Sequence, residues 1–334
     1  THPDITVGDI DLILGYLNED YFLGGKAKLN KERALKMLEE RMAKPLGQDI
    51  YEVSSKVLDL LHSDMCGHIH GMLLSKGLNP AEFTMLVYGG SGPLHAWGLD
   101  RGLSMGQLIM VPWAAAFSAF GVAAAEYFHR YDKAVTFFLT PDMTDDIKAM
   151  QGGGLSMTWQ ELEERGYAEL EAEGISRDAV TFRHGISCRY IGQLSNWEVP
   201  VEIGRPQTAE DVDKIIDAFE KYYVSIYPSG ARYPEAGYQI TEIYVEAVVQ
   251  KTKPVMITYP LQGKEPPKEA SKGKRQAYMD GEWSDFDILE MDLLEAGNRI
   301  DGPAIIEHPM TTLVIPPQNY VEFDEHKFIR YLKK

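Results

Sequence analysis

The segment from Phe83 to Pro112 constrains the fold most, because it alternates between two kinds of secondary structure. FTMLVYGG (Phe83–Gly90) is typical of a short buried strand, and PLHAWGLDRG (Pro93–Gly102) of a helix with proline in its first turn. QLIMVP (Gln107–Pro112) is typical of a second buried strand. The alternation predicts an α/β fold in which the two strands form a parallel pair.

The turn between the first strand and the helix is unusually rich in glycine, and it is the first candidate binding site. Its residues are Gly89, Gly90, Ser91, Gly92 and Pro93. Glycine lets another group approach the backbone, and free N–H groups at a helix start can face a phosphate or a nucleotide. A simple tight turn explains the same residues. The pattern is neither a GxxxxGK[ST] loop nor a Rossmann motif, since no acidic residue follows at the expected distance.

Composition excludes several classes of function. The chain has 334 residues, with 33 basic and 50 acidic side chains and a formal net charge of −17. This charge disfavours nucleic acid and anionic membranes as partners. We expect neither a signal peptide nor a membrane-spanning segment, because no apolar run has the necessary length and no signal-peptide pattern opens the chain. Two cysteines, Cys66 and Cys188, form no disulfide framework, which favours a reducing cytoplasm. Because the chain begins with Thr1, we expect either a removed initiator methionine or a piece of a longer protein.

The remaining elements of the first part are mainly helical. We expect helices from about Asp9, from Asn30 to a stop at Pro45 and Gly47, over residues 49–76, and over the small-residue run 114–131. The third of these carries an apolar stripe of Val53, Val57, Leu61, Met65 and Met72, and Gly77 is expected to cap it.

Near residue 135 the character of the sequence changes. MQGGGLSM (Met150–Met157) predicts a flexible turn and Thr158–Glu173 a charged helix. Strand-like runs and a Pro/Lys/Glu-rich linker (Leu261–Arg275) follow, and the last sixty or so residues are typical of short strands around turns. We therefore predict a first domain over 1–135 and a β-rich domain over 136–334.

Histidines cluster in LLHSDMCGHIHGM (Leu60–Met72), where His62, Cys66 and His70 follow one another at helical spacing. Eight residues rise about 12 Å along a helix, so one ion cannot be bound by both ends through bonds of about 2 Å. A two-residue partial site stays possible, but no metal site is assigned. His68 is expected to be a hydrogen-bonded core residue.

No catalytic residue can be assigned from spacing. Asp100–Ser104 imitates a DxGxS phosphate loop, but Gly102 is better explained as a helix C-cap. Asp9 and Asp11 lie at a helix start, where we expect at least one of them to cap it. Cys188 is most simply a small buried residue.

Five segments in order resemble the A-subunit side of the hydantoinase/oxoprolinase family. TVGDIDLILGYL with YFLGG resembles TVTDANLVLGRL…FLGG, LVYGGSGPLHA resembles GGAGPLHA, and MVPWAAAFSAFG resembles VP..AG..SA.G. RYIGQ (Arg189–Gln193) and GPAIIEHPMTTLVIPP (Gly302–Pro317) resemble RY.GQ and GPA.IE...T..V.PP. Among members of this family, the ATP-dependent ketone carboxylases of the acetophenone and acetone carboxylase type are the nearest match.

The resemblance implies the second half of an acetate/sugar kinase–Hsp70–actin-like (ribonuclease H-like) fold, followed by a β-rich domain. It also implies that Gly89, Gly90, Ser91, Gly92 and Pro93 line the adenosine end of an ATP cleft. The family's D-x-G-x-T loop and its second phosphate loop have no counterpart in this chain. We therefore expect ATP and Mg²⁺ to be shared with a partner that supplies the N-terminal half of the A-type subunit, within a hetero-oligomer that also contains a B-type subunit.

On this interpretation the chain is a subunit of a ligase that forms a C–C bond on a small ketone, and it is inactive alone. Departures from the family pattern favour an alternative: Gly8 replaces Thr, Ile10 replaces Ala, Ser91 replaces Ala, and YYVSIYPSG (Tyr222–Gly230) replaces an H…YG pattern. In that alternative the chain is a structural subunit with a degenerate nucleotide site. A subunit of an ATP-dependent hydantoinase or oxoprolinase is the other alternative.

Overall fold

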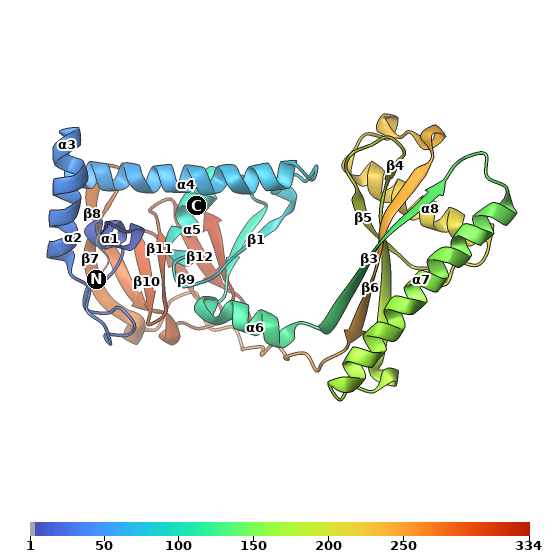
Figure 1. Cartoon of the computed structure of the whole chain (residues 1–334). Coiled ribbons are helices and arrows are strands. Elements are labelled where there is room, and N and C mark those ends of the chain that lie inside the picture. Colours follow the sequence, from blue (N-terminus) through green and yellow to red (C-terminus); the bar gives the residue numbers. More distant parts are fainter. Residues whose placement is uncertain (1–3) are drawn as a thin grey trace. The chain divides into compact units, whose positions relative to one another are not determined.

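The chain forms two compact units in a computed structural model that describes residues 4–334 (Figure 1). Unit 1 contains Thr1–Ala123 and Val255–Lys334, and unit 2 contains Ala124–Pro254. This division differs from the predicted domains 1–135 and 136–334, because the C-terminal strands pair with strands of the first part of the chain. Arg330 in the last strand, for instance, lies opposite Ile109.

Unit 1 is built on two sheets and a set of helices. Its helices are α1 (Val7–Ile13), α2 (Lys31–Leu38), α3 (Lys44–Leu46), α4 (Ile50–Leu74), α5 (Ala96–Gly102) and α6 (Phe117–Ala124), the last of which ends at the unit boundary. Its strands are β1 (Thr84–Val87), β2 (Gln107–Met110), β7 (Ser271–Met279), β8 (Glu282–Glu290), β9 (Arg299–Asp301), β10 (Ala304–His308), β11 (Thr311–Ile315), β12 (Asn319–Phe323) and β13 (Ile329–Lys333).

The two sheets of unit 1 share one apolar core. One sheet has the order β1-β2-β13-β12-β9, and its β1 and β2 form the predicted parallel pair. The other has the order β11-β10-β8-β7, with β10 and β11 joined as an antiparallel hairpin. The predicted linker Leu261–Arg275 therefore ends inside a strand, since β7 begins at Ser271.

Unit 2 is an antiparallel sheet with two helices. The sheet has the order β3-β6-β4-β5, from β3 (Tyr127–Leu139), β4 (Val180–Tyr190), β5 (Trp197–Val201) and β6 (Tyr238–Val249). The helices α7 (Asp145–Ala172) and α8 (Ala209–Ile226) pack together and supply apolar residues to the core of this unit. Cys188 lies in that core as expected, 1% exposed.

The triple glycine does not form the predicted flexible turn, because α7 runs through it. A Cβ atom on Gly152 would lie 2.9 Å from Val212 Cγ2, and one on Gly154 would lie 2.9 Å from Phe137 Cε1. The glycines thus allow α7 to approach α8 and β3 closely. The prediction of a turn at these glycines was wrong, because it considered only neighbouring residues and not the distant side chains that the glycines contact.

Two helices also differ from expectation. The predicted helix over 114–131 ends at Ala124, and Tyr127 begins β3. None of the residues of α6 is buried. The predicted stripe on α4 is buried at Val53 but 59% exposed at Met72. The α-helical turn after Asn30 agrees with the sequence, since the Asn30 side chain accepts a hydrogen bond from Arg33 N, and Gly47 has the left-handed φ of 62°.

Candidate active site

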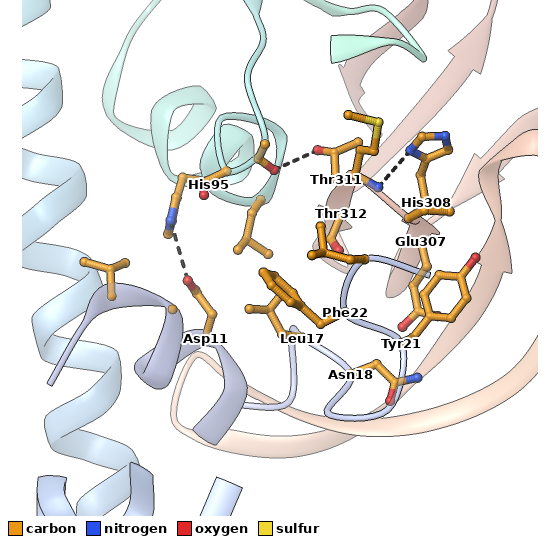
Figure 2. Close-up of a pocket in the computed structure, with 18 of the residues that line it drawn as sticks. Asp11, Leu17, Asn18, Tyr21, Phe22, His95, Glu307, His308, Thr311 and Thr312 are labelled. Atoms are coloured by element: carbon orange, nitrogen blue, oxygen red, sulfur yellow. Dashed lines mark hydrogen bonds and ion pairs between the residues drawn. The ribbon is translucent and has the colours of Figure 1, made fainter. Parts of the chain in front are cut away.

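A cavity of about 530 Å³ lies within unit 1 and brings together segments that are far apart in sequence (Figure 2). Its walls come from α1, the turn over residues 17–23, the loop over 90–95 and the β10–β11 hairpin. Leu17, Phe22, Leu61 and Leu94 supply apolar surface, and polar groups interrupt it. A partly apolar concave surface with a few polar groups is the usual form of a small-molecule site.

Only part of the predicted glycine turn lines this cavity. Gly90 and Ser91 do, whereas Gly89, Gly92 and Pro93 lie outside its lining. Gly89 has a φ of 90°, and its N–H donates to Ala114 O at 2.8 Å. Pro93 is buried at the start of a 3-10 turn that leads into α5.

The hairpin holds the glycine turn against the cavity. The Thr311 hydroxyl donates a hydrogen bond to Gly90 O at 3.0 Å, and Met310 N donates to His308 Nδ1 at 3.1 Å (Figure 2). A Cβ atom on Gly90 would lie 3.5 Å from Met310 O, an ordinary contact distance. Position 90 therefore has space for alanine, and its backbone is not forced into a conformation reserved for glycine.

The two aspartates of the first helix have different roles. Asp9 caps α1, because its carboxylate accepts from Thr6 N at 2.8 Å while Thr6 Oγ1 accepts from Asp9 N. Asp11 lies two residues further on, is 1% exposed, and lines the cavity. The expectation that at least one of the two aspartates caps the helix is correct. The spacing of the residues did not predict that Asp11 is buried.

Asp11 begins a row of buried titratable side chains. Its Oδ2 lies 3.6 Å from His95 Nε2, and His95 Nδ1 lies 3.2 Å from His62 Nε2. His62 is 5% and His95 6% exposed. The ring of His62 packs edge-on against Trp97. These three groups come from α1, from the turn before α5 and from α4, so only the tertiary fold could show their proximity.

Burial sets the protonation of all three groups. Loss of hydration raises the pKa of Asp11 to about 8. The same loss lowers the pKa of His95, and it lowers that of His62 to about 4, where His95 and Arg101 add to the effect. At neutral pH the row is therefore mostly uncharged, with a proton on the Asp11 carboxyl.

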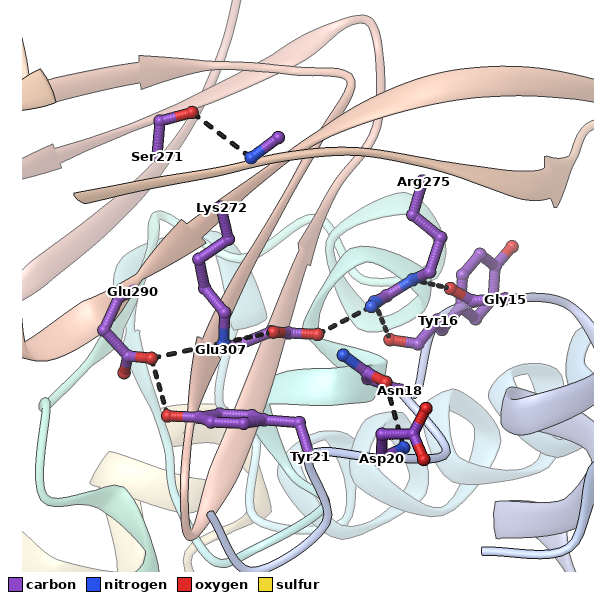
Figure 3. Close-up of polar contacts among 11 residues, drawn as sticks. Gly15, Tyr16, Asn18, Asp20, Tyr21, Ser271, Lys272, Arg275, Glu290 and Glu307 are labelled. Carbon is purple, nitrogen blue, oxygen red and sulfur yellow. Dashed lines mark hydrogen bonds and ion pairs between the residues drawn. The ribbon is translucent and has the colours of Figure 1, made fainter. Parts of the chain in front are cut away.

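A second polar cluster surrounds Glu307 of β10, which also lines the cavity (Figure 3). Glu307, 2% exposed, pairs with Arg275 Nη1 at 2.7 Å and with Lys272 Nζ at 2.6 Å. Lys272 also lies 3.2 Å from Glu290, and its Nζ stands over the ring of Tyr21, which donates to Glu290 at 2.6 Å. The cluster ties the turn over residues 17–23 to β7, β8 and β10.

Arg275 extends this tie to the end of α1. Its Nε donates to Gly15 O at 2.9 Å and its Nη2 donates to Tyr16 O at 3.2 Å. The carbonyl groups that follow α1 thus find their partners on β7. Because Asp11 belongs to the same helix, this arginine helps to determine where the Asp11 carboxyl lies.

The histidine cluster on α4 is not arranged as the sequence suggested. His68 is exposed and pairs with Asp64 at 3.7 Å, so its assignment as a core residue was wrong. His62 is the buried histidine instead. Together with Cys66 and His70 it lines a second cavity, of about 440 Å³, between α4 and α5. Within residues 4–334 there is no group of three or more His, Cys, Asp or Glu side chains placed to hold a metal ion.

Gly102 has a packing role and does not serve as the predicted left-handed C-cap. The C-cap residue of α5 is Leu103, and a Cβ atom on Gly102 would lie 2.5 Å from Cys66 Sγ on α4. Asp100 accepts from Asn319 Nδ2 at 3.1 Å. Contacts with other elements therefore explain both Asp100 and Gly102 of the DxGxS-like segment.

Two solved structures share the fold of this chain. The chain superposes on a structure described as acetone carboxylase, nucleotide-free, with a TM-score of 0.80 and 36% identity over 98% of this chain and 46% of that one. An ATP-dependent caprolactamase from Pseudomonas jessenii shares the fold, with a TM-score of 0.78 and 22% identity. The expected hydantoinase-type nucleotide-binding fold with a β-rich part is confirmed.

Residues 2–131 match the model of the hydantoinase/oxoprolinase family, and residues 142–334 match its C-terminal domain. The chain therefore belongs to the hydantoinase/oxoprolinase family.

Two relatives with names are subunits of ketone carboxylases. The acetone carboxylase beta subunit of Xanthobacter autotrophicus is 36% identical over 97% of this chain, and the acetophenone carboxylase gamma subunit of Aromatoleum aromaticum is 31% identical over 98%. The aligned parts make up 45% and 44% of those relatives, so the chain spans less than half of their length. No helix among the described residues is long and apolar enough to cross a membrane.

Proposed function

We propose that this chain forms part of an ATP-dependent ketone carboxylase of the acetone and acetophenone carboxylase type. In this proposal the enzyme is a hetero-oligomer that activates a ketone and bicarbonate by phosphoryl transfer and joins them by a C–C bond. Identity of 31–36% to subunits of two such enzymes, across nearly the whole chain, supports it. The two free cysteines, Cys66 and Cys188, are both buried, which is compatible with the cytoplasmic location we include in the proposal.

The observation that carries the proposal is that Gly90 and Ser91 open onto a cavity of about 530 Å³. We propose that this turn contacts the adenosine part of ATP, with Gly89, Gly92 and Pro93 shaping it. No lysine or arginine stands among the cavity-lining residues that the structure describes, while Asp11 and Glu307 do. Triphosphate needs cations and N–H groups at several points. The phosphate-binding groups and Mg²⁺ are therefore assigned to the remainder of the A-type subunit, and a B-type subunit completes the complex.

The test is a pair of substitutions at Gly90 in the assembled complex. Gly90→Ala fits the space at this position and serves as the control, whereas the branched side chain of Gly90→Val extends further from the backbone. We expect Gly90→Val to assemble normally and to raise the KM for ATP about tenfold, which corresponds to roughly 1.4 kcal/mol of lost binding. Normal KM and kcat in both variants would make the structural-subunit alternative the better one.

A cyclic amide is the second candidate substrate. The caprolactamase subunit alpha of Pseudomonas jessenii is 24% identical over 96% of this chain. Hydrolysis of a lactam or hydantoin consumes water and needs no bicarbonate. ATP turnover that depends on a cyclic amide and ignores bicarbonate would therefore select this alternative.

A further inference from the structure

Two cavities of unit 1 are joined by a row of buried side chains. Asp11 and His95 line the first cavity, and His62 lines the second, which is also lined by Asp59, His70 and Arg101. His62 and His95 are in hydrogen-bond contact, while Asp11 Oδ2 lies 3.6 Å from the other nitrogen of His95. Each imidazole can accept a proton on one nitrogen and release one from the other.

One oxygen of this row has no partner in the protein. Asp11 Oδ1 is buried and makes no hydrogen bond, although Asp11 itself lines the cavity. A buried polar atom without a partner costs about 1–3 kcal/mol. A purely structural carboxyl at this position would be expected to satisfy both oxygens, so the free oxygen indicates a group that a bound molecule contacts.

We propose that Asp11 is the proton-accepting group of the first cavity, and that His95 and His62 carry its proton to the second. The ligand is a carbon acid with a hydrogen next to a carbonyl group, such as a small ketone, bound at the Asp11–His95 side of the cavity, next to the part that the Gly90–Ser91 turn offers to adenosine. This assignment rests on the proposed function, because carboxylation of a ketone replaces such a C–H bond.

The transfer balances with the tautomers that the geometry allows. Asp11 Oδ2 and His95 Nε2 first close from 3.6 Å to hydrogen-bond distance, and the protonated Asp11 then gives its Oδ2 proton to His95 Nε2. His95 Nδ1 gives its proton to His62 Nε2. His62 Nδ1 then releases a proton to water in the second cavity. The resulting Asp11 carboxylate takes the proton of the ligand C–H bond, and the electron pair of that bond moves into a carbon–carbon double bond as the carbonyl oxygen becomes an enolate.

Loss of hydration keeps Asp11 a weak acid, and no lysine or arginine stands among the described residues that line the cavity. His95 faces it from the turn before α5, and Tyr16 is a neighbour from the end of its own helix. Across the cavity stand Glu307 and His308 of β10. Arg275 already pairs with Glu307, so this arginine is not free to stabilise the Asp11 carboxylate.

The experiment measures exchange of acetone hydrogens for deuterium in D₂O by NMR, with the assembled complex and a non-hydrolysable ATP analogue. We expect Asp11→Asn to lower the exchange rate about 100-fold, in the range of general-base catalysis. The wild-type rate should rise with pH up to about pH 8, and the variant should lose this dependence.

His62 is tested through the second cavity. We expect His62→Ala to slow exchange about tenfold and added imidazole to restore it in part, because the ring can enter the vacated space. His68→Ala on the same helix is the matched control, since His68 is exposed and lies outside the row. It should change neither the rate nor the response to imidazole.

The outcomes separate this inference from the proposed function. Exchange that depends on Asp11 in a complex that does not carboxylate would support the proton path and refute the carboxylase proposal. A complex that carboxylates at the wild-type rate and pH profile with Asp11→Asn would refute the proton path alone. Loss of exchange in His62→Ala without imidazole rescue, in a folded complex, would also count against it.

Discussion

The backbone of Gly92 runs so close to the carbonyl oxygen of Tyr88 that a Cβ atom on Gly92 would overlap it. This relationship closes the glycine turn between β1 and α5. We therefore expect Gly92→Ala to cost about 1–3 kcal/mol of unfolding free energy, as overpacking does. Urea unfolding of this variant beside Gly90→Ala measures the effect, and equal stability of the two variants would show that the turn relaxes freely.

The glycines of α7 allow a second comparison within one helix. A Cβ atom on Gly153 meets nothing within 4 Å, whereas one on Gly154 would press on Phe137. Since alanine is about 1 kcal/mol better than glycine in a helix interior, Gly153→Ala should stabilise unit 2 by up to this amount. Gly154→Ala should destabilise it. Thermal unfolding that ranks the two variants in the opposite order would contradict the close approach of α7 to β3.

Asp11 should make stability depend on pH. Its pKa is about 8 in the folded chain, above the usual value, so between about pH 4 and pH 8 the folded state binds a proton that the unfolded state has lost. The wild-type protein therefore loses stability as pH rises through this window. The loss approaches several kcal/mol, because each pKa unit corresponds to about 1.4 kcal/mol.

Asp11→Asn removes this titration and tests its sign. The melting temperature of Asp11→Asn, measured relative to that of the wild type, should increase as the pH is raised from 5 to 8. A gap between the two proteins that stays constant over this range would mean that the carboxyl is not desolvated in solution.

Arg275 and Lys272 should differ in their importance for the folded state. Both pair with Glu307, but Arg275 also donates to the carbonyl oxygens of Gly15 and Tyr16. Arg275→Met should cost about 3–5 kcal/mol, the range for a broken buried ion pair, and Lys272→Met should cost less. Denaturant titrations of the two variants measure the difference, and a larger loss for Lys272→Met would reverse our account of the cluster.

The chain by itself should bind ATP weakly. Among the described residues that line the cavity there is no lysine or arginine to neutralise a triphosphate. Isothermal calorimetry on the isolated chain should show no micromolar binding, while the assembled complex serves as the positive control. Micromolar affinity of the chain alone would contradict the division of the site between this chain and the rest of the enzyme.

Short-range sequence signals predicted many of the elements. The parallel pair of β1 and β2 and the helix after Pro93 follow from apolar runs and their boundaries. The capping roles of Asp9 and Asn30 follow from local side-chain chemistry in the same way. The resemblance that identified the family also depends on local motifs, and it is confirmed over residues 2–131 and 142–334.

The errors of the sequence analysis have a common origin in distant contacts. Gly152 and Gly154 were interpreted as a break because the partners that need their small size, Val212 and Phe137, are remote in sequence. His68 was placed in the core because it shares a helix with apolar residues, although the buried face is the one that carries His62.

What the sequence determined by itself is many of the elements and the family, since both depend on neighbouring residues in the chain. What only the tertiary structure decided is the site. Asp11 becomes a buried, uncharged acid because the fold brings His95, from the turn before α5, and the other walls of the cavity around α1, and no local pattern encodes that loss of hydration. The C-terminal strands likewise join unit 1 only in the tertiary structure, through hydrogen bonds between β13 and β2. Bringing these two distant segments together costs chain entropy, and this cost is offset only once the whole core forms.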